Sequence, residues 1–395
     1  MAEAKDIIEA YDNLGISKED LGDVLLEQIN SEDQDKMKAA VQNSISQGLV
    51  TTKTQKEALL GLFGSDAPKQ DSRSRVGRVY GGKYKCTRVV DEEGGEGVLM
   101  KVIAGDKYGA LKEFDASKPH QKSRIKDSIN AQKRVPRSQN LANYLDDFVD
   151  GGRIYLLTDW KDGLTEDEIL RRSVAPLSPM DVSAILRGGA LGARDLHNSD
   201  VVHRDYNPTN LIIDENGIIA TIDITLAKDP LNEEHYRTGT GSGVVGTLIY
   251  SSKEQLKRAK DIGSGKKDNS TDVTPRTDVY QLGLIGLKSL TGIDLFYGDK
   301  QVEIKKKIMR GVSSPKVRHL MLSRNPYRDS HSGPARKLYN VICKALKRKY
   351  RNGGEMLQDL NVVLDSYGLK QPLIDDKCRS QMRQLLRRVN YVRIN

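Results

Sequence analysis

The stretch VVHRDYNPTNLIIDENGIIATIDITLAK, residues 201–228, decides how this sequence is interpreted. It places three polar side chains that carry oxygen atoms, Asp205, Asn210 and Asp223, among apolar runs. A single aspartate or asparagine in a loop is usually a turn or capping residue, so none of the three is informative alone. Together they offer carboxylate and amide oxygens, which are the ligands that a hard cation such as Mg²⁺ prefers.

The spacing of these residues resembles the catalytic loop and metal-binding segment of protein kinases, H-R-D-x-x-x-x-N followed by a short hairpin and D-F-G. The triplet His-Arg-Asp ends at Asp205, Asn210 follows it by five residues, and Asp223 stands where the D-F-G aspartate would be. The resemblance implies that Asp205 accepts or orients the proton of a substrate hydroxyl. It also implies that Asn210 and Asp223 bind Mg²⁺.

Matches upstream of the catalytic loop concern the nucleotide. Lys101 in VLMKVI fits the strand lysine of V-A-I-K that holds the α- and β-phosphates of ATP, although a lone strand lysine would usually be an exposed charge. The segment RIYLLTDW (153–160) resembles the strand and hinge against which adenine stacks. By this resemblance Thr158 is the gatekeeper, and Asp159 and Trp160 follow it in the hinge.

Matches downstream concern the substrate. The segment GTLIYSSKEQL (246–256) resembles the end of a kinase activation segment, and TDVYQLGLIGLKSLTG (277–292) resembles the helix that anchors the helical lobe. In that helix Asp278 matches the buried acid beneath the catalytic loop. Small-molecule phosphotransferases of related fold usually lack both segments, so we expect a protein substrate. Altogether the resemblance covers about residues 76–365.

The glycine-rich loop that covers the phosphates is expected at residues 77–82. Gly77 and Gly82 match the first and third glycines of G-x-G-x-x-G, but Val79 stands at the second. A plain Gly-Gly hairpin turn is the alternative for this segment.

Other departures from the family pattern bear on activity. D-F-G is replaced by D-I-T, which keeps the metal ligand but changes the apolar residue behind it and removes the glycine. Asn207 occupies the place where Ser/Thr kinases usually carry a lysine that steadies the transferred phosphoryl group, and a neutral amide cannot replace that charge. A helix glutamate for Lys101 is not obvious. Among Glu113, Asp115 and Asp127, we expect Asp127 to serve.

The loop RTGTGSG offers Thr238, Thr240 and Ser242 as candidate phosphorylation sites. Arg204 precedes the catalytic aspartate, as in kinases whose activation-loop phosphate pairs with this arginine. The alternative is that the three hydroxyls are ordinary loop residues.

The 395 residues divide into four predicted segments. Apolar residues at helical spacing predict a small all-helical unit over 1–63, either a docking or regulatory module or a plain extension. The polar segment 64–75 is a predicted linker. The kinase domain follows over 76–365, with an N-lobe to about 160 and a C-lobe from about 161. A basic tail, 366–395, is expected to be helical and to pack on the C-lobe, although an acidic partner, nucleic acid or a membrane surface could bind it.

Composition sets the broad class. Residues 1–70 carry 7 Lys/Arg and 13 Asp/Glu, a net charge of −6. Because the whole chain has a net charge of +9, the remaining residues carry +15. No aromatic-interleaved basic strip supports nucleic acid specifically, so we do not expect it as a partner. The sequence shows no apolar run of membrane-spanning length and no secretory signal, and its three distant cysteines suit free thiols. We expect a cytoplasmic protein.

We therefore predict an α+β, two-lobed protein kinase fold, with a small antiparallel sheet and a mainly helical lobe, behind the helical N-terminal unit. The predicted function is transfer of the ATP γ-phosphoryl group, with Mg²⁺, to Ser/Thr hydroxyls of proteins, including the chain's own activation loop. The rival interpretation is a pseudokinase or scaffold, which binds nucleotide or a partner without turnover. Docking of partners through the acidic N-terminal helices or the basic tail is a further expectation.

Overall fold

The computed structural model describes residues 75–91, 97–114, 119–173, 176–224, 248–257, 273–298, 300–327, 332–370 and 373–391. These residues belong to one compact unit, Ser72–Asn395. The predicted helical unit 1–63, the predicted linker apart from Arg75, and the candidate sites Thr238, Thr240 and Ser242 lie outside the described residues.

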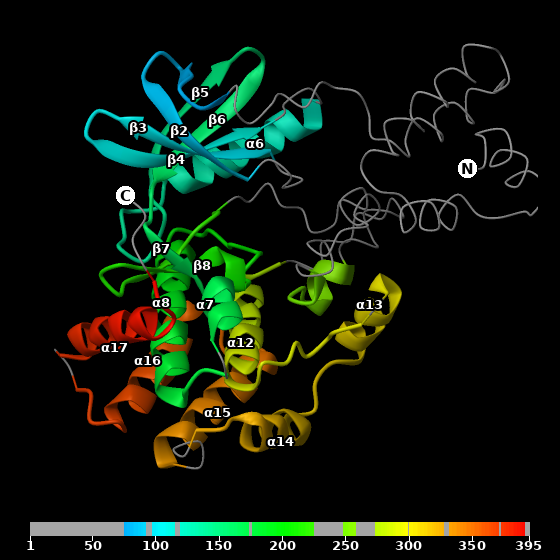
Figure 1. The fold of residues 1–395 in the computed structure, drawn as a ribbon. Coiled ribbons are helices and arrows are strands. Elements are labelled where there is room, and N and C mark those ends of the chain that lie inside the picture. Colours follow the sequence, from blue (N-terminus) through cyan, green and yellow to red (C-terminus); the bar gives the residue numbers. More distant parts are fainter. Residues whose placement is uncertain are drawn as a thin grey trace, which may run out of the picture. The chain divides into compact units, whose positions relative to one another are not determined.

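The chain first forms an antiparallel six-stranded sheet with the strand order β1-β2-β3-β4-β6-β5. Helix α6 (Pro119–Lys133) is inserted between the fourth and fifth strands (Figure 1). The strands are β1 (Val79–Tyr80), β2 (Tyr84–Asp91), β3 (Val98–Ala104), β4 (Lys107–Phe114), β5 (Tyr144–Asp150) and β6 (Arg153–Asp159).

Side-chain alternation gives this sheet two different faces. On one face Tyr80, Met100, Leu111 and Leu157 form a buried cluster, over which the sheet curls until Tyr84 stacks on Phe148 at a centroid distance of 5.7 Å. The other face packs on α6 through a second cluster. Its members are Phe114, Ile125, Ile129, Ile154 and Leu156.

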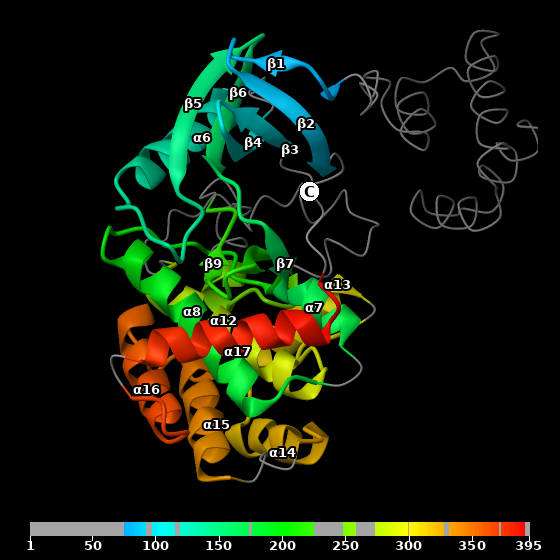
Figure 2. The same ribbon diagram turned by 60° about the vertical axis from the view of Figure 1, so that its left-hand side comes forward.

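The rest of the chain is mainly helical, with a small sheet of order β7-β8-β9 next to the first lobe (Figures 1 and 2). Helices α8 and α12 are buried along most of their length and form the centre of the larger hydrophobic core. The elements are β7 (Gly163–Thr165), α7 (Glu166–Arg172), α8 (Pro179–His197), η1 (Pro208–Asn210), β8 (Leu211–Asp214), β9 (Ile219–Thr221), α12 (Pro275–Thr291), α13 (Gln301–Arg310), α14 (Ser314–Arg324), α15 (Gly333–Leu346), α16 (Gly353–Asp365) and α17 (Ile374–Arg388).

The predicted C-terminal tail forms α17, which packs on α8 as expected. Its apolar side chains, including Met382 and Leu385, join the core of the helical lobe. Its arginines contact the same lobe: Arg388 pairs with Asp181 at 2.7 Å, and Arg383 donates to the Asn216 carbonyl oxygen at 3.0 Å. These two arginines of the tail are therefore engaged within the chain.

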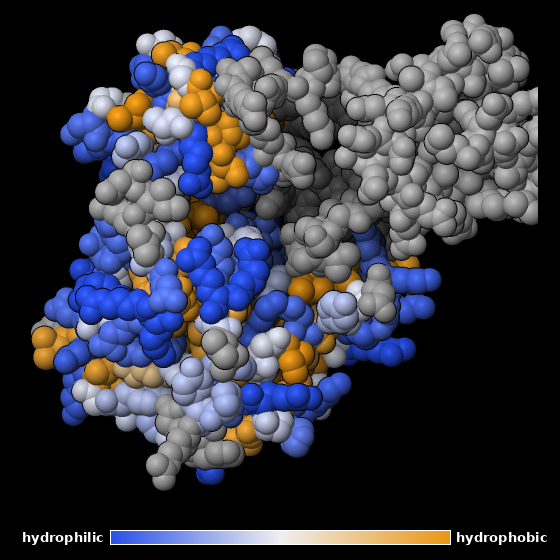
Figure 3. All heavy atoms as spheres, viewed as in Figure 1, coloured by the Kyte–Doolittle hydropathy of each residue, from blue (hydrophilic) through white to orange (hydrophobic). Residues whose placement is uncertain are grey.

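The predicted succession of a strand-rich lobe and a helix-rich lobe is confirmed. In the view of Figure 3, hydrophilic side chains dominate the described surface and apolar ones are scattered. Among the described helices, none combines the length and the apolarity that crossing a bilayer requires. All three cysteines are buried free thiols, as expected.

Candidate active site

A buried carboxylate holds the loop that precedes β8. Asp278 on α12 is fully buried and accepts hydrogen bonds from the backbone N–H groups of His203 (2.9 Å) and Arg204 (2.8 Å). The ring Nε2 of His197 lies 2.8 Å from the same carboxylate. Arg204 has a φ of 70°, which is unusual for a residue with a side chain, so these contacts hold a strained backbone in place. The anchoring acid predicted from the sequence is thus found beneath the loop.

Asp205 and Asn210 lie together in this loop. The Nδ2 group of Asn210 donates to the Asp205 carboxylate at 3.0 Å and to its carbonyl oxygen at 2.8 Å. Because both bonds use Nδ2, the Oδ1 atom of Asn210 takes no part in them. Asn207 caps the short helix η1, since its Oδ1 accepts from the Thr209 N–H at 2.8 Å. Asn207 is also buried, and this hydrogen bond shows that its role in the loop is that of a capping residue.

Asp223 reaches the same place from β9. The N–H of Ile222 donates to the Asn210 carbonyl oxygen at 3.0 Å, so the segment that carries Asp223 lies against the catalytic loop. Asp223 has a φ of 55°, a conformation that aspartate tolerates better than most residues. The structure therefore brings all three predicted acid and amide residues into one region.

The lysine at this region is Lys112, on β4. Its Nζ lies 2.8 Å from the Asp223 carboxylate, and both side chains are largely buried. Lys101 lies on the neighbouring strand β3, where its Nζ is 3.5 Å from Asp162. The sequence-based prediction gave Lys101 the contact with the nucleotide phosphates, but the geometry points to Lys112.

Strand order explains the difference. In the kinase pattern the lysine strand is the one that leads into the first helix, and here β4 is followed directly by α6. The segment YGALKEF (108–114) contains this lysine in an A-L-K context as close to V-A-I-K as VLMKVI. The helix after it was the signal that could have selected Lys112.

The residues predicted to form the glycine-rich loop do not lie on the strands next to Lys112. Gly77, Val79 and Gly82 belong to the β1–β2 hairpin, and β1 is the edge strand, three strands from β4. Val79 is half exposed. The segment that connects β2 to β3, EEGGEG (92–97), is also glycine-rich, and β3 is the strand next to β4, which carries Lys112. Only Gly97 of that segment is among the described residues, with a φ of 124° that favours glycine.

The predicted hinge connects the two lobes. Thr158 pairs with Ala110 across β6 and β4. Asp159 turns its carboxylate to Asn143, whose Nδ2 donates to it at 2.9 Å. Trp160 donates from its indole Nε1 to Asp162 at 2.9 Å.

Helix α6 does not supply the expected acid. Asp127 is the only acidic residue in the helix and its side chain is exposed, so it does not serve the buried lysine. Among the described side chains of α6, the buried polar ones are Ser128 and Gln132. Glu113 is buried on β4 but pairs with Arg75 (2.8 Å) and Arg153 (2.7 Å).

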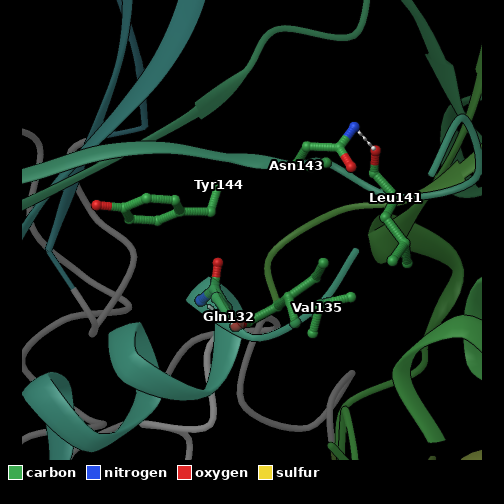
Figure 4. A pocket seen from close by; sticks show the side chains of 7 residues that line it. Gln132, Val135, Leu141, Asn143 and Tyr144 are labelled. Atoms are coloured by element: carbon green, nitrogen blue, oxygen red, sulfur yellow. Dashed lines mark hydrogen bonds between the residues drawn. The ribbon is translucent and has the colours of Figure 1, made fainter. Parts of the chain in front are cut away.

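Gln132 instead connects α6 to the segment after Asp223. Its Nε2 donates to the carbonyl oxygen of Ile224, the residue in the place of the D-F-G phenylalanine. Ile224 is buried against Leu141. Figure 4 shows Gln132 with Val135, Leu141 and Tyr144 around the small cavity beside this contact. An amide side chain of α6 thus connects this helix to the Asp223 segment.

Two buried acids support the lobe around this region. Glu254, near the end of the predicted activation segment, accepts from Thr277 Oγ1 at 2.8 Å and pairs with Arg348. Glu166, at the start of α7, is fully buried and accepts from the Ser289 hydroxyl. Burial raises the pKa of Glu166 to about 8, while the Ser289 hydrogen bond opposes this shift. Glu166 is therefore mostly protonated at neutral pH.

The donor set suits a magnesium nucleotide. Asn210 Oδ1 and the Asp223 carboxylate are hard oxygen donors, and Lys112 places a positive charge beside them. Within the described residues, no three His, Cys, Asp or Glu side chains converge on a metal-sized site. A Mg²⁺ that arrives with nucleotide phosphates needs only one or two protein carboxylates.

Comparison with known proteins agrees with this geometry. The family model "Protein kinase domain" matches residues 86–392. "Probable serine/threonine-protein kinase CPE1738" of Clostridium perfringens is 24% identical over 308 residues, 73% of this chain and 39% of the relative. PknB of Mycolicibacterium smegmatis is 26% identical over 233 residues, 58% of this chain and 33% of the relative. PknA of Corynebacterium glutamicum is 24% identical over 302 residues, 74% of this chain and 58% of the relative.

All three relatives are named serine/threonine-protein kinases, and the chain spans less than two thirds of the length of each. The match over residues 86–392 covers more than half of the chain and extends into the segment predicted as a tail. It confirms the family indicated by the catalytic-loop motif. The chain belongs to the protein kinase domain family.

Proposed function

We propose that this chain transfers the γ-phosphoryl group of ATP, with Mg²⁺, to Ser or Thr hydroxyls of protein substrates. The observation that carries the proposal is the convergence of Asp205, Asn210, Asp223 and Lys112 around a loop anchored by Asp278. The names of the relatives support the choice of Ser/Thr protein substrates.

In this proposal each residue has a separate task. Asp205, oriented by Asn210, accepts or orients the proton of the attacking hydroxyl. Asn210 and Asp223 would hold Mg²⁺ through oxygen atoms, and Lys112 would hold the phosphates. When bound, Mg²⁺ and ATP supply charge neutralisation and the phosphoryl group. Catalysis by the chain then consists of positioning and charge complementarity.

The departures from the family pattern are compatible with an active enzyme. Lys112 contacts Asp223 directly, so its position does not require an acid on α6. Asn207 orders the loop as the cap of η1. We therefore favour turnover over the pseudokinase alternative.

Finer aspects stay predictions. Autophosphorylation at Thr238, Thr240 or Ser242, docking through the N-terminal helices or the tail, and a cytoplasmic location follow from the sequence pattern alone. The low expectation of nucleic-acid binding has the same basis.

Mass spectrometry after incubation with ATP and Mg²⁺ tests the proposal. The full chain, alone and with a generic basic protein substrate, should gain phosphate. The variant Asp205→Asn should lose this gain. The matched control Asp200→Asn changes an exposed aspartate five residues earlier, whose positive φ of 56° asparagine also tolerates, and should behave as the wild type. If wild type and Asp205→Asn stay equally unmodified across substrates and metals, the scaffold alternative replaces the proposal.

A further inference from the structure

Lys101 has a well-defined environment that the proposed reaction does not use. Its side chain is 14% exposed, and its Nζ lies 3.5 Å from the Asp162 carboxylate. The same ammonium lies 4.2 Å from the ring centroid of Tyr108 and 4.7 Å from that of Trp160. One cation thus joins β3, the start of β4 and the segment between the two lobes.

Lys101, Asp162, Tyr108 and Trp160 form the Lys101 cluster, and the pairing register places this cluster relative to the proposed nucleotide site. Lys101 pairs with Ala110, and Ala110 pairs with Thr158, so the three residues lie side by side on one face of the sheet. Lys112, two residues along β4, is on the same face and reaches Asp223. This face is therefore the one that looks toward the catalytic loop.

The cluster marks one end of that face. Along β4 the order is Tyr108, Ala110 and Lys112. Lys112 marks the phosphate end, so a nucleotide bound there would extend its base toward Ala110 and the hinge. Beyond Ala110 lies Tyr108, whose carbonyl oxygen accepts from the Trp160 N–H at 3.4 Å. The Lys101 ammonium closes this outer end by reaching from β3 to Asp162.

We propose that Lys101 and Asp162 form a latch over the base end of the nucleotide site, which a purine base has to open when it binds. The inference rests on the proposed nucleotide site but not on catalytic turnover. Opening the latch separates an ion pair and two cation–π contacts. A base that stacks beside Trp160 replaces only part of these interactions, so the latch weakens nucleotide binding.

The test is a binding titration followed by the fluorescence of Trp160, the only tryptophan in the sequence. Adenosine is the main probe because it carries no phosphate charge, and ATP with Mg²⁺ is the second. Lys101→Met keeps the long apolar stem and removes the charge, and Asp162→Asn removes the other partner. Lys85→Met, an exposed lysine on the adjacent strand β2, is the matched control.

We expect Lys101→Met and Asp162→Asn each to bind adenosine about threefold to thirtyfold more tightly than wild type, the range set by one ion pair and two cation–π contacts. The double variant should gain little beyond either single one, because both remove the same latch. Lys85→Met should bind as the wild type does.

Other results overturn the latch. If Lys101→Met weakens ATP binding and leaves adenosine binding unchanged, Lys101 is a phosphate ligand. Unchanged affinity for both probes would show that the pair does not oppose binding. If neither wild type nor any variant binds either probe, both the proposed nucleotide site and the latch are wrong. If the chain binds the probes but transfers no phosphate, the latch is unaffected and only the proposed turnover is wrong.

Discussion

Replacement of Asp278 by Asn tests whether this buried carboxylate holds the catalytic loop. The wild-type side chain accepts from two backbone N–H groups and contacts His197. Asparagine keeps one acceptor oxygen, so in either orientation it turns an NH₂ group toward a backbone N–H that loses its partner. A buried donor without a partner costs about 1–3 kcal/mol, and the opposed donors add a similar amount. We expect the free energy of unfolding to fall by about 2–6 kcal/mol.

Urea unfolding of the full chain measures this loss, and phosphate transfer follows the loop. Because Arg204 is held in a strained conformation, release of its N–H should also displace Asp205, and transfer should fall more steeply than stability. Asp167→Asn, which breaks an exposed pair with Arg171, is the control and should cost less than about 0.5 kcal/mol. If Asp278→Asn costs no more than this control and transfers phosphate at the wild-type rate, the anchoring role is refuted.

Two further predictions concern stability. The pKa of Glu166 is about 8 in the folded chain, whereas an unperturbed glutamate has a pKa of 4.5. The protonated side chain therefore contributes its full stability below pH 4.5, and this contribution is lost as the pH rises to 8. Glu166→Gln should flatten that dependence and be more stable than wild type at pH 8.5, as measured by urea unfolding; parallel pH profiles would contradict the assignment. Gly217 has a φ of 78° and an added Cβ would lie 2.2 Å from the Arg379 carbonyl oxygen on α17, so Gly217→Ala should destabilise the chain by at least about 1–2 kcal/mol. Thermal unfolding checks this, and a loss under about 0.5 kcal/mol would show that α17 moves freely to make room.

The catalytic loop could be predicted from the sequence because its chemistry is concentrated in one segment. Asp205, Asn210 and Asp223 lie within 19 residues, and the hairpin β8–β9 fixes their separation. Asp278 could be predicted as well, because it lies in the first turn of a long apolar helix with a distinctive motif. Local sequence is sufficient where a short segment both forms the structure and carries the residues.

The lysine and the glycine-rich loop depend on the strand order, which local patterns do not determine. Lys101 and Lys112 stand in similar apolar strands, and only the position of α6 after β4 distinguishes them. The short strand β1 comes before the strands of the family pattern. Counting strands along the sequence therefore assigned the glycine-rich loop to Gly77–Gly82 and not to the segment that ends at Gly97. The sequence also does not predict that Ser128 is buried and Asp127 exposed, because α6 has little apolar periodicity.

Asp205 and Lys112 are the two residues on which the proposed phosphate transfer depends most. The most direct measurement is the initial rate of label transfer from γ-labelled ATP to a protein substrate, compared among wild type, Asp205→Asn, Lys112→Met and Lys101→Met. We expect rates reduced about 10²-fold or more for Asp205→Asn and Lys112→Met, and continued transfer by Lys101→Met. Wild-type transfer by Lys112→Met together with loss in Lys101→Met would contradict it.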